Sequence, residues 1–207
     1  MKQNYQLILD KIIGSECVGG RRPTLLLHAC CAPCSSYVLE YLTNFFDITL
    51  FFYNPNISPK DEFDFRGAEL VRLTREMKLS GEVKTVLGAY EPEKFYALTE
   101  GFEELSEGGA RCARCYRLRL SETARYAAEG GYDFFCTTLS ISPHKNAEWL
   151  NDIGTEEGEK HGVRYLTSDF KKRDGNKRSC QLSEEFGLYR QDFCGCEFSK
   201  KAKHPTK

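Results

Sequence analysis

The chain has 207 residues, a formal net charge of −1 and 41% hydrophobic residues, enough for one domain that buries roughly 70% of the surface its unfolded chain exposes. No apolar run reaches the roughly 18 residues that a membrane-spanning helix needs, and the first residues, "MKQNYQLILDKIIGSEC", carry charges where a secretory signal would be continuously apolar. These features argue against a membrane partner and predict a cytoplasmic protein.

Short apolar runs alternate with longer amphipathic segments along most of the chain. Strands are expected at residues 24–29, 47–54, 82–88, 134–138 and 163–167. Helices are expected at residues 35–44, 58–80, 112–128 and 142–162, the last starting with Ser142 as its cap and Pro143 at its first position. The alternation of buried-type strands and helices predicts an α/β fold whose parallel sheet is covered by helices on both faces.

A single domain with flanking segments is expected. Its parts are a helix and linker at 1–23, the α/β core at 24–168, a basic, cysteine-containing extension at 169–199 and a disordered tail at 200–207. Residues 1–170 hold 19 Lys and Arg against 25 Asp and Glu, whereas residues 171–207 hold 10 against 5. The basic end of the chain indicates contact with a polyanion.

Residues with reactive or polar side chains follow several of the expected strands. In open α/β sheets the ligand site lies outside the carboxyl ends of the strands. The residues expected along this rim are Cys30, Cys31, Cys34, Asn54, Asn56, Thr137, Thr138, Ser140 and His144. A role in the site is expected for His144, whereas His28, at a strand end, is expected to be buried and hydrogen-bonded.

Seven of the ten cysteines fall into three tight groups, which is more than ordinary core filling requires in a reducing compartment. The first group lies in "HACCAPCSS", the loop after the first strand. A loop that cradles phosphate at this place normally contains glycines, which allow the backbone to approach the anion, and this loop has none. The sequence therefore argues against a nucleotide-phosphate loop and puts thiols in its place.

The second group, "RCARC", opens the helix expected at 112–128, where a spacing of three lets Cys112 and Cys115 face the same side. Together with the first group it could supply four thiolates to either a structural zinc or an iron–sulfur cluster, and spacing alone does not separate the two. A third adjacent thiol, the rim position and the lack of paired hairpin knuckles favour iron–sulfur. A thioredoxin-like dithiol in "CAPC" fits poorly because it leaves Cys30 and Cys31 without a purpose.

The third group is "CGC", Cys194 and Cys196. A disulfide between residues two apart is strained and easily reduced, so the pair suits electron transfer. Metal ligation and two incidental buried thiols are the alternatives. Of the lone cysteines, Cys136 is expected in the core.

A basic segment follows the last expected strand. Its cations are Lys171, Lys172, Arg173, Lys177 and Arg178, and the helix at 112–128 with the residues before it adds Arg111, Arg114, Arg117 and Arg119. The plain interpretation is a solvated loop. Cations beside a redox site also suggest a nucleic-acid substrate bound through its phosphates.

Several motifs recur together in a fixed order: "LLLHACCAPCSS", "FFYNPNISPKDEFDFR", "RCARCYRLRL", "FCTTLSISPHKN", "SDFKK" and "LSEEFGLYRQDFCGCEFS". From about residue 24 to 199 this combination resembles the cobalamin-independent epoxyqueuosine reductases, the QueH family. The resemblance implies reduction of epoxyqueuosine to queuosine in the anticodon loop of tRNA, with electrons from an external donor. It also implies a Rossmann-like fold similar to the ATP-pyrophosphatase and adenine nucleotide alpha hydrolase group.

The resemblance further implies site residues. Cys30, Cys31, Cys112 and Cys115 would bind a 4Fe-4S cluster, and Cys194 and Cys196 would form a redox-active disulfide. By spacing alone Cys34 would be a ligand; the resemblance leaves it for a second, mononuclear iron. His144 or Asp169 would supply a proton to the departing oxygen. The remaining alternatives are an iron–sulfur tRNA-thiolating enzyme and a zinc-stabilised RNA-binding module.

Overall fold

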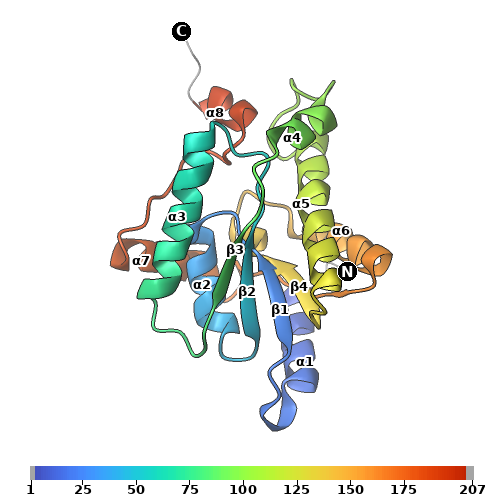
Figure 1. The fold of residues 1–207 in the computed structure, drawn as a ribbon, viewed down its shortest axis with the longest axis vertical. Helices are drawn as coiled ribbons and strands as arrows, with labels where there is room; N and C mark the ends of the chain where they lie inside the picture. The colour runs from blue at the N-terminus through green and yellow to red at the C-terminus, as the bar shows by residue number, and fades with distance from the viewer. Residues whose placement is uncertain (1–2, 204–207) are drawn as a thin grey trace.

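A parallel five-stranded sheet between two layers of helices forms the centre of the computed structural model, which describes residues 3–203 (Figure 1). The strands are β1 (Thr24–His28), β2 (Asp47–Phe52), β3 (Lys84–Leu87), β4 (Phe134–Thr137) and β5 (Arg164–Tyr165), in the spatial order β3-β2-β1-β4-β5. All four neighbouring pairs are parallel. The predicted α/β class and the five predicted strands are confirmed.

Eight α-helices are described: α1 (Tyr5–Glu16), α2 (Ala32–Leu42), α3 (Lys60–Glu76), α4 (Pro92–Thr99), α5 (Ala110–Glu129), α6 (Ala147–His161), α7 (Gly175–Glu185) and α8 (Glu197–Lys203). Short 3₁₀ turns, η1 (Val18–Gly20) and η2 (Thr138–Ile141), precede β1 and follow β4. Among the described helices none is long and apolar enough to cross a bilayer.

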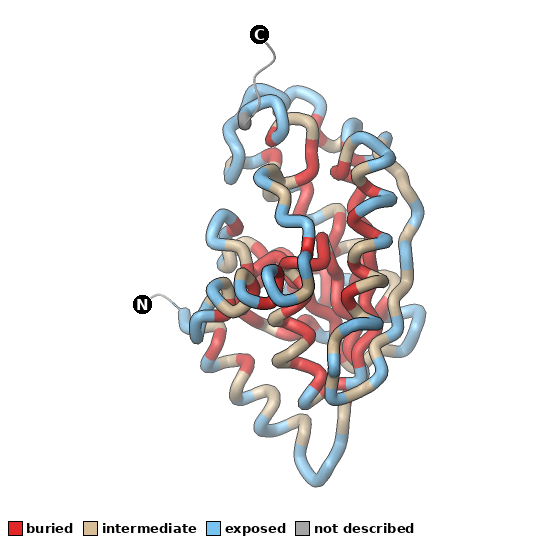
Figure 2. Tube along the Cα trace, turned by 90° about the vertical axis from the view of Figure 1, so that its left-hand side faces the viewer, coloured by how far each residue is buried: buried red, intermediate tan, exposed pale blue. Residues whose placement is uncertain are grey.

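The central strand β1 explains why helices cover both faces of the sheet. Leu25 and Leu27 pack into one apolar cluster with α1, α2 and α3, whereas Leu26 between them packs into another with α5 and α6. All three side chains are fully buried, and each contributes about 2 kcal/mol through the hydrophobic effect. Figure 2 shows this buried layer running through the middle of the molecule. A strand buried on both faces reads as a continuous apolar run, which is why the sequence predicts it well.

The segment after β5 is part of the same packed unit. Phe170 and Leu182 are buried, and α7 is fixed to α2 by a hydrogen bond of 2.7 Å from Ser179 Oγ to the Pro33 carbonyl. Residues 200–203 belong to α8, so the prediction of a disordered tail is wrong for them. Helix-favouring Lys and Ala residues and a 3.2 Å ion pair between Lys201 and Glu197, one turn apart, account for the helix. Residues 204–207 of the predicted tail lie outside the described residues.

Helix α6 begins later than predicted. Asn146 is its cap, with Oδ1 accepting from the Trp149 N–H at 3.2 Å, rather than Ser142 followed by Pro143. Ser142 Oγ instead accepts from the His144 N–H at 3.3 Å, so residues 142–145 form a turn. Ser-Pro and Asn are both acceptable helix starts. The turn leaves residues 142–145 outside the helix, where they line the cleft described below.

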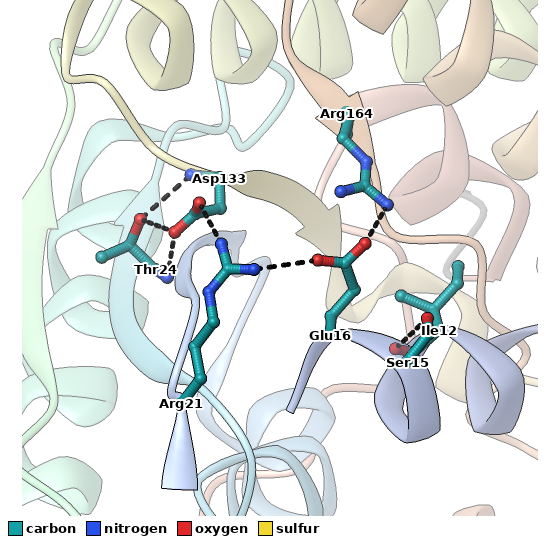
Figure 3. A network of polar contacts seen from close by, with 7 residues as sticks. All are labelled: Ile12, Ser15, Glu16, Arg21, Thr24, Asp133 and Arg164. Carbon is teal, nitrogen blue, oxygen red and sulfur yellow. Dashed lines mark hydrogen bonds and ion pairs between the residues drawn. The ribbon is translucent and has the colours of Figure 1, made fainter. Parts of the chain in front are cut away.

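A polar network ties the amino ends of β1 and β4 together (Figure 3). The Asp133 carboxylate accepts from the Thr24 N–H at 2.8 Å and the Thr24 hydroxyl at 2.9 Å, and it pairs with Arg21 at 3.1 Å. Arg21 continues to Glu16, which pairs with Arg164 at 2.7 Å. The network joins α1, β1, β4 and β5 at the end of the sheet where these strands begin.

Asp133→Asn is expected to lower the free energy of unfolding by about 1 kcal/mol at neutral pH, a modest value because the side chain is 37% exposed. The backbone hydrogen bond from Thr24 is the main reason why the pKa of Asp133 lies below its usual value. A carboxylate whose pKa is lowered by folding stabilises the folded state above its ordinary pKa of about 4, and this stabilisation is lost as pH falls through the pKa in the folded state. The difference in unfolding free energy between wild type and Asp133→Asn should therefore shrink below about pH 4. Urea unfolding at several pH values measures it, with exposed Asp174→Asn as the control; an equal loss in both variants would contradict the assignment.

Candidate functional site

Three thiols meet directly after β1. Cys30 and Cys31 link β1 to α2 and Cys34 lies in the first turn of α2; their Sγ atoms all lie within 4.8 Å of one another. The Sγ atoms of Cys30 and Cys31 are 3.7 Å apart although the residues are adjacent. Cys31 has the extended backbone of a helix cap, with φ −171° and ψ 165°, and the helix then brings Cys34 back toward it. Among the described residues, this is the group of three ligand-type side chains that could hold a metal ion.

The three thiols share hydrogen bonds, which shifts their pKa values in opposite directions. Hydrogen bonds from Cys30 and Cys34 lower the pKa of Cys31 well below its usual value. The contact with Cys31 is the largest cause that raises the pKa of Cys30 to about 11, and the contacts with Cys30 and Cys31 raise that of Cys34. Cys31 is therefore the thiol of the group that loses its proton most readily, and metal binding would release further protons.

The second and third cysteine groups line one small cavity. Cys112 and Cys115 lie one turn apart on α5, and Cys194 and Cys196 face them from the segment before α8, together with Asn56 from the loop after β2. Burial raises the pKa of Cys115 to about 11 and that of Cys196 to about 12. The fold thus brings together two groups that are about eighty residues apart in the sequence.

The "CGC" turn depends on its glycine. Gly195 has φ +109°, and a Cβ there would lie 3.0 Å from both Arg66 Nη1 and Ile57 Cγ1. Its carbonyl accepts from the Ser58 N–H at 3.0 Å, which fixes the turn beside the loop after β2. Cys194 and Cys196 are free thiols in the structure.

A cleft of about 760 Å³ opens above the first cysteine group. Its walls include Cys30, Cys34 and Cys194 together with the basic side chains Arg66, Arg119, His144, Lys145 and Arg190. Asp192 and Glu107 are the acidic residues among those that line it. Thiols and an excess of positive charge therefore share one cavity at the carboxyl ends of the strands, where the sequence predicts the thiols and His144.

A buried lysine connects the cleft to the third cysteine group. Lys145 Nζ lies 3.0 Å from Glu107 Oε1 and 3.1 Å from Cys194 Sγ. Ser199 Oγ donates to the other Glu107 oxygen at 3.1 Å and accepts from the Cys194 N–H at 3.0 Å. The side chain of Lys145 is 8% exposed. Its charge therefore acts on Cys194 with little screening by solvent.

Buried polar atoms without partners surround the cysteines. Arg119 is 1% exposed; its Nε donates to the Cys115 carbonyl at 3.3 Å, but its Nη2 has no partner, and its side chain lines both the cleft and the small cavity. Arg66 Nη2 and Asn56 Oδ1 are also buried and unpaired. Unsatisfied buried donors are costly. A guanidinium N–H beside a set of thiol ligands fits a bound group with additional acceptor atoms, such as the sulfides of an iron–sulfur cluster.

The residues predicted as cluster ligands are only partly brought together. Cys30 and Cys31 adjoin one another as required, but Cys112 and Cys115 lie outside the 4.8 Å group, and Cys34 lies within it. Cys30 and Cys112 pack against the same apolar cluster, and Arg119 lies between the two cavities. The all-thiol donor set and the unpaired Arg119 fit a metal–sulfur centre.

The two candidate proton donors have different surroundings. His144 lines the cleft from the turn before α6. Asp169 is 6% exposed, pairs with Lys171 at 2.6 Å and is not among the residues that line the cleft. His28 is fully buried and bonded to Thr137 Oγ1 and the Tyr53 carbonyl, and its pKa is lowered to about 4 by burial, so it is the satisfied core histidine that was expected.

The predicted basic segment is partly neutralised within the chain. Lys171 pairs with Asp169, Arg173 with Asp10 at 2.6 Å, and Arg178 with Glu40. On α5, Arg117 pairs with Glu156 and Glu157, and Arg111 donates to the Glu103 carbonyl at 2.6 Å. The cations that line the cleft instead include Arg66, Lys145 and Arg190, which no expected motif singles out. The available signal for Lys145 was its place beside His144 in "SPHKN".

Comparisons with known proteins find a family match along most of the chain. A family model described as Epoxyqueuosine reductase QueH matches residues 25–202. The chain is similar to proteins named Epoxyqueuosine reductase QueH. The one from Streptococcus pyogenes serotype M1 is 42% identical over an alignment that covers 97% of this chain and 79% of that protein. The one from Thermotoga maritima is 37% identical over an alignment that covers 87% of this chain and 94% of that protein.

One solved structure, that of NMN synthetase from Francisella tularensis, has a TM-score of 0.50 at 11% identity and covers 98% of this chain and 81% of that chain. That likeness concerns the Rossmann-like fold alone. The match along residues 25–202, which spans all three cysteine groups, and the identity with these relatives lead to one assignment: the chain belongs to the epoxyqueuosine reductase QueH family.

Proposed function

We propose that the chain reduces epoxyqueuosine in the anticodon loop of tRNA to queuosine. The observation that supports this most directly is the basic cleft, which is lined by Cys30, Cys34 and Cys194 and in which the buried Lys145 contacts Cys194. The reaction turns an epoxide into an alkene: both carbon–oxygen bonds to the ring oxygen break, two electrons and two protons enter, and water leaves. Thiols, cations and a proton-bearing histidine supply what these changes require.

In this proposal Cys30, Cys31, Cys112 and Cys115 hold a 4Fe-4S cluster. When bound, such a cluster passes electrons one at a time. Because Cys34 Sγ lies within 4.8 Å of the sulfurs of Cys30 and Cys31, Cys34 has two possible roles. It replaces Cys112 or Cys115 as a cluster ligand, or it binds a second metal, iron, beside the cluster. Arg119 would donate its unpaired Nη2 hydrogen to the bound group and offset its negative charge.

Cys194 and Cys196 complete the electron count. Oxidation of this dithiol to a disulfide releases two electrons and two protons, the same numbers that the epoxide consumes. A ring closed between residues two apart is strained, so an external donor reduces it again readily. The Lys145 ammonium lies 3.1 Å from Cys194 Sγ, one of the two sulfurs of this dithiol.

A proton must reach the departing oxygen. His144 lies on the cleft wall and is the proposed donor, and Lys145 stabilises negative charge that develops on the oxygen. Asp169 takes no part because it is paired with Lys171 away from the cleft. The modified base reaches this depth by leaving the stack of the anticodon loop, where bases are not held in a duplex.

The test is anaerobic purification and reconstitution, followed by metal and sulfide analysis and an assay on tRNA that carries epoxyqueuosine, with dithionite as a strong one-electron reductant. We expect a coloured protein with about four iron and four sulfide per chain, and conversion of the base to queuosine. A colourless, zinc-loaded protein would support a zinc-stabilised RNA-binding module instead. An iron-loaded protein that thiolates tRNA and leaves the epoxide intact would support the other alternative.

A further inference from the structure

A buried arginine of α3 lies against the Cys-Gly-Cys turn. Arg66 Nη1 donates to the Cys194 carbonyl at 3.4 Å, and a Cβ on Gly195 would lie 3.0 Å from the same nitrogen. The guanidinium also lies over the Phe193 ring, with Cζ 5.1 Å from the ring centroid. Arg66 therefore lies beside three successive residues at the turn, although it precedes Cys194 by 128 positions in the chain.

Glu62 fixes the position of this arginine. Its carboxylate accepts from Arg66 Nε at 2.7 Å, one helical turn away on α3, and the side chains of Arg66 and Glu62 are 2% and 17% exposed. A charge-assisted hydrogen bond with so little solvent around it is strong. Because the guanidinium is planar, the bond at Nε also sets the plane in which Nη1 meets the Cys194 carbonyl. Glu62 and Arg66, the α3 pair, thus connect α3 to the turn.

The turn that the α3 pair contacts holds its two cysteines as thiols with separate partners. Lys145 Nζ lies 3.1 Å from Cys194 Sγ, and the Ser199 N–H donates to Cys196 Sγ at 3.4 Å. Both cysteines are free here, whereas a disulfide would join their sulfurs at about 2.05 Å, so the turn must move when the disulfide closes. Contacts that hold the turn in its present conformation therefore stabilise the dithiol relative to the disulfide.

We propose that Glu62 and Arg66 set the reduction potential of the Cys194–Cys196 pair by holding the turn in the conformation of the dithiol. This inference rests on the proposed function, because it takes Cys194 and Cys196 as a redox-active pair. Reduction breaks the sulfur–sulfur bond with two electrons and two protons, which a thiol donor supplies as it is oxidised to its own disulfide. Arg66 is a positioning residue, since it acts through the Cys194 carbonyl and the Phe193 ring.

The dithiol–disulfide equilibrium can be measured on a single peptide. Trypsin cleavage after Arg190 and Lys200 releases residues 191–200, in which Cys194 and Cys196 are the only cysteines. Reconstituted full-length protein is equilibrated anaerobically in glutathione buffers of known potential, quenched with acid, alkylated, digested and analysed by mass spectrometry. As the protein disulfide forms, one glutathione disulfide becomes two glutathione thiols. The ratio of oxidised to alkylated peptide in each buffer gives the midpoint potential of the pair.

Arg66→Met should shift this equilibrium about tenfold toward the disulfide, which lowers the midpoint potential by about 30 mV. Arg66→Met combined with Glu62→Gln leaves no unpaired charge behind and should show the same shift, even where the single variant folds poorly. Arg66→Lys keeps the charge but loses the planar guanidinium, so it should shift the midpoint in the same direction.

Arg72→Met is the matched control. Arg72 is another arginine of α3 that pairs with glutamates of its own helix, Glu69 and Glu76, but it donates to the Phe186 carbonyl and not to the turn. The midpoint of this variant should equal that of wild type. An equal shift in Arg72→Met and Arg66→Met would assign the effect to a general loosening of α3 and would overturn the inference.

Turnover of epoxyqueuosine in tRNA, measured on the same proteins, separates this inference from the proposed function. A lowered midpoint in Arg66→Met supports the role of the α3 pair, whether or not wild-type protein turns over this substrate. Wild-type turnover with the same midpoint in wild type and Arg66→Met overturns the role of the α3 pair alone. Wild-type protein that forms no Cys194–Cys196 disulfide in any buffer contradicts both the redox role of the dithiol and the inference that rests on it.

Discussion

If the proposed 4Fe-4S cluster is present, Cys112→Ser is expected to abolish it and to lower turnover more than about 100-fold. A serine oxygen replaces the sulfur without a large change in volume, so the metal-free fold should survive. Cys112 is only half-buried and its Sγ accepts one hydrogen bond, from the Gly108 N–H at 3.3 Å. Iron and sulfide content after desalting, the visible absorption spectrum and the melting temperature of the metal-free protein measure the three effects separately.

Cys180→Ser is the matched control, because Cys180 is a half-buried cysteine on α7 that belongs to none of the three groups. It should keep full iron content and turnover. Cys34→Ser distinguishes two ligand sets: it should retain the cluster if Cys34 serves only a second metal. If Cys34→Ser loses all iron and Cys112→Ser keeps it, the ligands are the three thiols within 4.8 Å, and the assignment implied by the resemblance is wrong.

Lys145→Met is expected to lower the free energy of unfolding by about 2 kcal/mol and turnover by about tenfold or more. The change leaves the Glu107 carboxylate without its cation, and the Glu107 side chain is only 32% exposed. It also removes the charge beside Cys194 Sγ. The loss should stay below the 3–5 kcal/mol typical of a fully buried pair, because solvent still reaches Glu107.

The pH dependence of this loss follows from the two partners. Burial alone would lower the pKa of Lys145, but the charges of Cys194, Tyr116 and Glu107 raise it, so its contribution is full below its ordinary pKa of about 10.5. Burial works to raise the pKa of Glu107, but Lys145 lowers it, so this contribution disappears only as pH falls below about 4.

Urea unfolding of Lys145→Met and of Lys145→Arg, which keeps the charge, should therefore show a constant difference between about pH 5 and 7, above the ordinary Glu pKa and below the ordinary Cys and Lys pKa values. A loss in Lys145→Arg as large as in Lys145→Met would mean that the shape of the lysine side chain, and not its charge, is what matters.

The sequence predicts the sheet well and the ends of helices less well, for a physical reason. Strands such as β1 are buried on both faces, and burial leaves a continuous apolar signal that needs no knowledge of the rest of the fold. The start of α6 depends on whether Ser142 or Asn146 caps it, and both are good caps, so the choice is made by the turn that follows η2.

Some features of the site can likewise be predicted from the sequence, and others cannot. That Cys30, Cys31 and Cys34 lie beyond the carboxyl end of β1 follows from their place directly after the first expected strand, and it could be predicted. Spacing alone predicts Cys34 as a ligand with Cys30 or Cys31, but that all three sulfurs meet depends on the backbone angles of one residue, Cys31. The pairing of Arg173 with Asp10 joins residues 163 positions apart, so the true cationic wall of the cleft could not be read from local composition.

The close spacing of Cys30, Cys31 and Cys34 also makes oxidation compete with metal binding in the metal-free chain. Three sulfurs within 4.8 Å of one another form an arrangement in which a sulfur that has been oxidised reacts with a neighbouring thiol to form a disulfide. Two sulfurs joined in a disulfide cannot bind iron as thiolates, so added iron does not bind there until a reductant restores the thiols. How much active protein a preparation contains is then decided by which arrives first, oxygen or metal.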